Sequence, residues 1–143
     1  MKPKFFELRE LLPKDTYNNL HVGLGDKLWL MFDGRLLRTI DKIREKHGRM
    51  EVNNWFRSGN CQYRGWRPFD CSTGAFLSQH KFGRAIDLFP MDTTVDDVRD
   101  DIINNQNDDA YKLISAIELD VNWIHIDFRN WDRDTNGIFL IHP

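Results

Sequence analysis

The sequence lacks both a strong excess of one charge sign and any long hydrophobic segment. Its 143 residues include 20 Lys and Arg against 22 Asp and Glu, which gives a formal net charge of −2. This near balance argues against nucleic-acid binding, because proteins that bind nucleic acids usually carry a basic excess. No apolar run approaches the roughly 18–20 residues that a membrane-spanning helix needs. We therefore expect neither a nucleic-acid partner nor a membrane span.

Cysteines are also scarce, since Cys61 and Cys71 are the only two. They do not form a CxxC pattern, and two thiolates are too few for a cysteine-based zinc site. The N-terminal residues MKPKFFELRELLPKD contain no long apolar segment of the kind found in secretory signals. We therefore expect synthesis in the cytoplasm without a signal peptide, where cysteines are more often reduced than bridged. The site of action is left open by this observation.

What the chain does contain is enough apolar material for one folded domain over residues 1–143. Apolar residues make up 41% and aromatic residues 13% of the sequence, which is too much for a disordered protein. We take a monomer as the default state. Helical and strand-like segments alternate, which predicts an α+β fold. Helices are expected before Pro13, in residues 33–48 and within 93–119, and strands in residues 50–56, 83–89, 122–129 and 136–143, whereas residues 18–32 fit neither pattern clearly.

The segment SQHKFGRAIDLFP, residues 78–90, combines a histidine and an aspartate with a predicted strand. Side chains alternate across a strand, so Asp87 shares a face with the small Ala85, which leaves room beside the carboxylate. Gly83 permits a tight backbone turn directly after His80. Such a turn can bring the imidazole back over the strand, next to Asp87.

The segment WIHIDFR, residues 123–129, alternates strictly between two kinds of side chain. One face is apolar, and the other carries Trp123, His125, Asp127 and Arg129. A polar row of this kind is costly to bury unless it is organised around something. If the two strands are neighbours, His80, Asp87 and His125 converge, and two histidines with one carboxylate form a zinc site of the catalytic type. Taken singly, each of these residues is more often satisfied by hydrogen bonds and binds nothing.

These residues together follow a pattern that resembles a known family. The pattern S-x-H-x-x-G-x-A-x-D, followed by W-x-H-x-D, is similar to the zinc D-Ala-D-Ala carboxypeptidases and related peptidoglycan peptidases of the M15 family. Upstream, Tyr63-Arg64 and the small pair Gly74-Ala75 match further parts of the family pattern. The resemblance extends from about residue 5 to 130. The matching residues of the two motifs are Ser78, His80, Gly83, Ala85, Asp87, Trp123, His125 and Asp127.

The resemblance implies a fold and a cofactor. It implies a small antiparallel sheet flanked by helices, as in zinc DD-carboxypeptidases and hedgehog-like domains. It also implies a zinc ion with three protein ligands, which would be His80, Asp87 and His125.

The resemblance further implies residues that contact the substrate. Arg64 corresponds to the arginine that holds a substrate carbonyl or carboxylate and helps to stabilise the oxyanion, and a guanidinium suits this role because it stays charged and is planar. Arg67 is the alternative for this role if the loop aligns with the family pattern in a shifted register. Ser78 and Trp123 are expected beside the substrate. The alternative for Arg64 is an ordinary exposed arginine, as most loop arginines are.

The general base is where the sequence departs from the family pattern. Many members place an acidic residue or a histidine two or three positions before the last zinc ligand, but Asn122 and Trp123 stand there and neither can accept a proton. Asp127 shares the strand face of His125 and is therefore the expected catalytic residue that acts as general base. Glu118 and Asp120 are the next candidates for this role. Asp127 has an alternative role, in which it only orients His125 or binds the neighbouring arginine.

Two functions from different classes follow from these expectations. The first is a zinc metallopeptidase that hydrolyses an amide bond in peptidoglycan stem peptides or cross-bridges. A short member of this kind resembles bacteriophage endolysins or virion proteins, which act on the host cell wall. The second is a non-catalytic module of the same fold that binds a cell-wall peptide or a protein partner, which the missing base at Asn122 and Trp123 favours.

Overall fold

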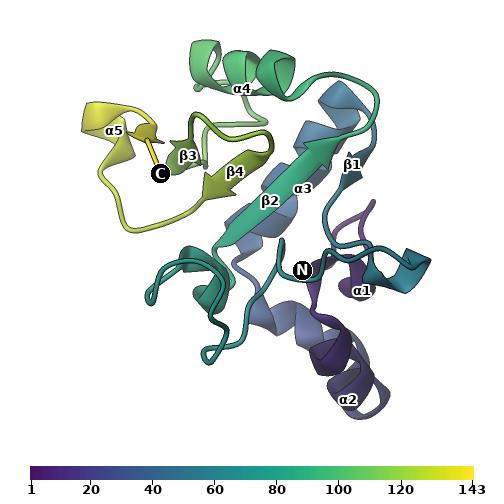
Figure 1. The fold of residues 1–143 in the computed structure, drawn as a ribbon. Coiled ribbons are helices and arrows are strands. Elements are labelled where there is room, and N and C mark those ends of the chain that lie inside the picture. The colour runs from purple at the N-terminus through teal and green to yellow at the C-terminus, as the bar shows by residue number, and fades with distance from the viewer.

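A five-stranded mixed sheet forms the frame of the α+β fold in a computed structural model that describes residues 1–143 (Figure 1). The strand order is β1-β2-β4-β3-β5. The pairs β1–β2, β2–β4 and β3–β4 are antiparallel, whereas β5 runs parallel to β3. The strands are β1 (Met50–Glu51), β2 (Ala85–Pro90), β3 (Ala116–Glu118), β4 (Ile124–Asp127) and β5 (Phe139–Ile141).

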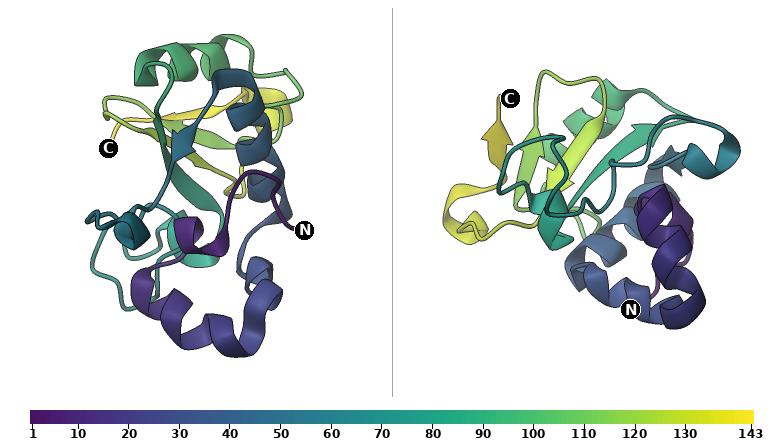
Figure 2. Two further views of the ribbon diagram at one scale, coloured as in Figure 1. Left: turned by 90° about the vertical axis from the view of Figure 1, so that its right-hand side faces the viewer. Right: turned by 60° about the horizontal axis from the view of Figure 1, so that its bottom comes forward.

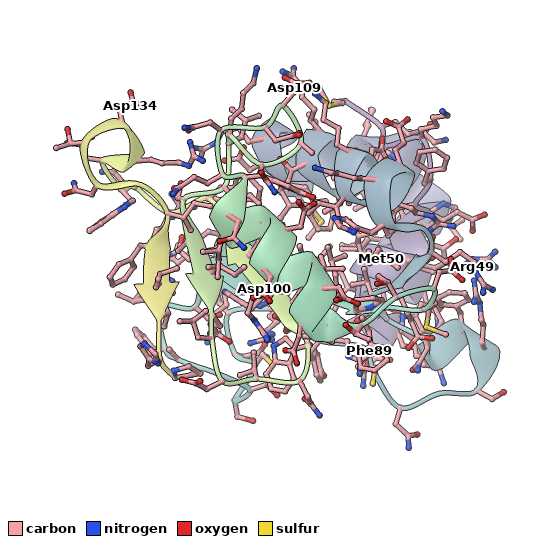
Figure 3. The ribbon with its side chains drawn as sticks, turned by 90° about the horizontal axis from the view of Figure 1, so that it is seen from above. Arg49, Met50, Phe89, Asp100, Asp109 and Asp134 are labelled. Carbon is pink, nitrogen blue, oxygen red and sulfur yellow. The ribbon has the colours of Figure 1, made fainter.

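The parallel pair corrects the expectation of a purely antiparallel sheet. After β4 the chain passes through the short helix α5 (Arg133–Asn136) before it enters β5. This connection is too long for a tight hairpin, so it carries the chain past β3 to the far edge of the sheet. Seen from above, Arg49 beside β1 and Asp134 in α5 lie at opposite ends of the sheet (Figure 3).

The longest helix, α3 (Gly34–His47), covers one face of the sheet (Figures 1 and 2). It begins where the sequence predicts, because the carboxylate of Asp33 accepts a hydrogen bond from the Arg35 backbone N–H. It ends at Gly48, whose φ of 88° is unfavourable for other residues. The other helical segments are α1 (Leu8–Leu11), α2 (Lys14–Leu24), η1 (Gly25–Met31), η2 (Trp55–Arg57), η3 (Gln79–Phe82) and α4 (Val95–Asn104).

The hydrophobic core lies between α3 and the sheet. From the strands it receives Ile86, Leu88, Ile124 and Ile126, all of which are fully buried. Full burial of an aliphatic side chain contributes about 1.5–3 kcal/mol relative to an exposed one. Since alternate residues of β2 and β4 are committed to this core, their polar residues must lie on the opposite face.

Several elements differ from the sequence-based expectations. Residues 18–32 are largely helical, because they fall within α2 and η1. The strand expected at 50–56 keeps only its first two residues, and residues 116–118 form β3 where a helix was expected. Three residues are too few to show a period of two, so β3 could not be recognised from its pattern. None of the helices combines the length and the apolar character needed to cross a membrane.

Candidate metal centre

A row of ionisable side chains crosses three neighbouring strands on the face opposite α3. Asp87 of β2 is the cross-strand partner of His125 in β4. Ile117 pairs with Ile126, so the next pair in the same antiparallel register places Glu118 of β3 on the other side of His125. The sheet therefore presents Asp87, His125 and Glu118 side by side.

His80 reaches this row from the turn that precedes β2. The turn closes with a hydrogen bond from the Gly83 N–H to the His80 carbonyl, and Gly83 has a φ of 66°. A Cβ at Gly83 would lie 1.8 Å from the Met31 carbonyl oxygen, so both the backbone conformation and the space require glycine. The expected turn is thus confirmed, and it places His80, which is only 1% exposed, beside Asp87.

The tautomer of His80 is fixed by a backbone carbonyl. Its Nδ1 lies 2.7 Å from the Gly65 carbonyl oxygen and must donate, because a carbonyl can only accept. The Nε2 atom is therefore left without a proton and is available as a metal ligand. The backbone at Gly65 packs closely against Leu11, since a Cβ at position 65 would lie 2.1 Å from the Leu11 carbonyl oxygen.

Three potential ligand atoms lie close enough together for one metal ion to bind all of them. His80 Nε2 lies 3.3 Å from both His125 Nδ1 and Asp87 Oδ1, and the last two atoms are 2.7 Å apart. In a tetrahedral zinc site, bonds of about 2.0–2.1 Å place the ligand atoms roughly 3.3 Å from one another. The two distances from His80 match this spacing, whereas the Asp87–His125 distance is that of a hydrogen bond. The three side chains are buried and form the potential metal-binding group that the sequence predicts. Two imidazoles and one carboxylate are donors that suit a zinc ion, and all three residues line the cleft.

The electrostatics of the cluster also favour a cation. Burial acts to raise the pKa of Asp87, but the charges and hydrogen bonds of the two histidines hold that pKa well below its ordinary value. Burial has the opposite effect on a histidine, because its charged form is the protonated one, and it lowers the pKa of His80. For His125, hydrogen bonds with Asp127 and Asp87 outweigh burial and raise the pKa to about 9. Carboxylates surrounding His125 thus stabilise positive charge at this position.

The cleft above the cluster has a volume of about 400 Å³. Ser78 and Trp123 line it. The segment from Thr73 to Ser78 forms one wall, and it includes the small pair Gly74-Ala75. The volume of this cleft falls within the range of small-molecule binding pockets, and the three potential ligand residues line it.

The two arginines considered for substrate binding have different positions. Arg67 lines the cleft, whereas Arg64 points away from it, pairs with Glu51 at 3.2 Å and lies over the Phe89 ring. Arg67 is bound on all sides: it donates through Nε to the Tyr63 carbonyl at 2.5 Å and through Nη2 to Asp87 Oδ2 at 3.0 Å. The structure thus disfavours Arg64 as the substrate arginine. It places Arg67 behind Asp87, where the guanidinium donates to Oδ2 and leaves Oδ1 facing the two histidines.

Arg67→Lys is expected to weaken zinc binding by about 10–100-fold, the usual cost of losing a partner behind a metal ligand. Lysine keeps the charge but cannot bridge a carbonyl and a carboxylate with a planar fork. Arg64→Lys is the matched control and should leave zinc affinity within about threefold, as is usual for changes away from a site. Competition titration against a chromophoric chelator measures both affinities. Equal effects of the two substitutions would contradict the assignment.

Asp127 is fully buried, and its carboxylate is already engaged. Arg129 donates to both oxygens, with Nε–Oδ1 and Nε–Oδ2 distances of 2.9 and 3.0 Å. Asp127 Oδ2 also lies 3.5 Å from His125 Nε2, the ring atom that faces away from the other ligands. Burial acts to raise the pKa of Asp127, but the bonds to His125 and Arg129 lower it to about 2. This geometry favours the role in which Asp127 orients His125 over the role of general base.

Of the three acidic residues considered for the general base, only Glu118 both lines the cleft and is partly exposed. Its side chain is 21% exposed and lines the cleft, with Oε1 3.9 Å from His125 Nε2. Asp120 instead pairs with His142 at the surface and does not line the cleft. The sequence favours Asp127 over Glu118 because Asp127 shares the strand face of His125, whereas the three residues of β3 carry no strand pattern that would place Glu118 beside β4.

No family model, curated protein or solved structure matches the chain.

Proposed function

We propose that the protein is a zinc-dependent peptidase that hydrolyses an amide bond in peptidoglycan stem peptides or cross-bridges. The observation that carries this proposal is the spacing of His80 Nε2, Asp87 Oδ1 and His125 Nδ1 at the bottom of an open cleft. Three ligands with a free fourth position are typical of catalytic zinc sites, whereas structural sites use four protein ligands. The M15-like order of the motifs supports peptidoglycan as the source of the substrate.

The residues around the cluster have separate roles in this proposal. A bound zinc ion supplies Lewis-acid chemistry, since it lowers the pKa of water and polarises a carbonyl group. The Glu118 carboxylate accepts a proton from the attacking water and then delivers it to the leaving nitrogen. Arg67 holds Asp87 and Asp127 holds His125, so that both ligands keep their orientation during turnover. Ser78 and Trp123 position the peptide along the wall of the cleft.

The biological setting is part of the same proposal. The resemblance of the motifs to the M15 family suits a bacteriophage endolysin or virion protein that acts on the host cell wall. The scissile bond is either the terminal D-Ala-D-Ala amide or an amide of a cross-bridge.

Digestion of purified cell walls tests this function. We expect zinc-loaded protein to release new amino groups, a chelator to abolish the release, and added zinc to restore it. Mass spectrometry of the products identifies the bond that is cut. If the protein holds zinc and binds the wall but releases no amino groups, the non-catalytic binding module is the correct function.

A further inference from the structure

Two residues that line the cleft stand at the ends of the turn between β3 and β4. Glu118 is the last residue of β3, and Trp123 directly precedes β4. Between them, Asp120 has a φ of 58°, a left-handed conformation that aspartate tolerates better than most residues. Trp123 is only partly buried, so packing constrains its indole less than it would a core side chain. The direction of this indole therefore depends on the backbone of the turn.

Arg99 of the neighbouring helix α4 holds the backbone of this turn (Figure 1). Its Nη2 donates to the Val121 carbonyl at 2.5 Å and to the Trp123 carbonyl at 2.9 Å, so one nitrogen joins two points of the turn. Arg99 is only 9% exposed, and the residues beside it in α4, Val98 and Ile102, belong to the hydrophobic core. The guanidinium is thus anchored in the rigid part of the molecule.

The other contacts of the turn act at its opposite end or at the surface. The Leu119 N–H donates to the Ile141 carbonyl at 2.8 Å, which fixes the end next to β3. Asp120 pairs with His142, but both side chains are largely exposed, and exposed ion pairs contribute little to stability. Hydrogen bonds from a charged donor are stronger than neutral ones. The end of the turn that carries Trp123 therefore depends mainly on Arg99.

From these contacts we propose that Arg99 is a positioning residue for substrate binding, which fixes the Val121 and Trp123 carbonyls and so sets the direction in which the Trp123 indole enters the cleft. Arg99 does not line the cleft, so it acts through the turn and not by touching the peptide. The inference rests on the proposed peptidase function and adds to it a residue that lies outside both sequence motifs. Arg99 precedes Trp123 by 24 positions, so no local pattern connects the two.

A double-mutant cycle of Arg99→Met and Trp123→Ala tests whether the two residues act together. Methionine keeps a long side chain but has no donor, so Arg99→Met should weaken binding of the stem pentapeptide L-Ala-D-Glu-L-Lys-D-Ala-D-Ala by about 10-fold while zinc content stays at the wild-type level. In the Trp123→Ala background, the same change should alter the affinity by about twofold or less, because Arg99 has no effect once the indole is absent. Calorimetry on the four zinc-loaded proteins measures the affinities.

Arg133→Met is the matched control, and it should leave the peptide affinity unchanged. Arg133 also has a buried Nε without a partner and donates through Nη2 to a distant backbone carbonyl, that of Gln106, but it belongs to α5 and does not line the cleft. A second readout needs no ligand. Hydrogen exchange measured by mass spectrometry should become faster in residues 119–123 of Arg99→Met but not of Arg133→Met. Arg99→Lys should retain part of the wild-type affinity, because one ammonium nitrogen carries three donors.

The outcomes distinguish this inference from the proposed function. Unchanged peptide affinity in Arg99→Met, or a loss of the same size with and without Trp123, would overturn the inference. Peptide binding by Trp123→Ala at the wild-type level would also overturn it, even if Arg99→Met does not fold. If wild-type protein binds the peptide but hydrolyses neither it nor cell walls, the cycle still decides the role of Arg99 while the peptidase proposal fails. If wild-type protein binds no peptide, the inference is overturned, and digestion of cell walls decides the peptidase proposal separately.

Discussion

Alanine at His80, Asp87 or His125 is expected to abolish stoichiometric zinc binding. Wild-type protein should retain about one zinc ion per chain after dialysis, as a site with three protein ligands implies. Each substitution removes one of three atoms that lie within 3.3 Å of one another. The loss should exceed the roughly 10–100-fold decrease that follows removal of a partner behind a ligand. Elemental analysis of the dialysed proteins measures the zinc content.

His142→Ala is the matched control for these substitutions. His142 is an exposed histidine that pairs with an aspartate outside the cleft, so its loss should leave zinc content unchanged. A second readout is thermal unfolding, because zinc at about 100 times its Kd should add about 2.7 kcal/mol to the stability of wild-type protein. The three alanine variants should show no such stabilisation. Full zinc retention in any two of them would refute the ligand assignment.

Glu118→Gln is expected to lower kcat by about 10²–10⁴-fold, the typical contribution of general-base assistance. Glutamine has nearly the same shape but cannot accept a proton, so the fold and the zinc content should remain as in wild type. The position of Glu118 opposite His125, with an exposed edge in the cleft, is the reason for this expectation. Turnover of a stem peptide at saturating zinc measures the effect.

Asp127→Asn is the comparison that separates the two carboxylates. Asp127 holds His125 and Arg129 from a buried position, so its replacement should mainly weaken zinc affinity, by about 10–100-fold. Excess zinc should then restore much of the activity in Asp127→Asn but none in Glu118→Gln. If instead Asp127→Asn keeps its zinc and loses activity while Glu118→Gln remains active, Asp127 is the base, as the sequence motif by itself suggested.

Local patterns in the sequence were sufficient for the core elements of the site. The alternation in residues 122–129 predicted which side chains of β4 are buried in the core and which face the polar side, because a strand repeats its face every two residues. The same rule placed Asp87, and the Gly83 turn placed His80, because a glycine at positive φ is a local requirement of the chain. That these three side chains converge depends on the pairing of β2 with β4, which the sequence leaves conditional, and their assignment as ligands comes from the resemblance of the motifs.

The tertiary structure alone decided which charged residues surround those ligands. Arg64 and Arg67 are three residues apart in one loop, and only the packing of that loop shows that Arg67 reaches Asp87. Glu118 became the stronger candidate for the base because β3 pairs with β4, and a three-residue strand carries no periodic signal of its own. The parallel pairing of β5 likewise depends on where the connection after β4 leads. Alternation and turn residues act within a few neighbouring positions, whereas register, burial and ion pairing depend on contacts between segments far apart in the chain.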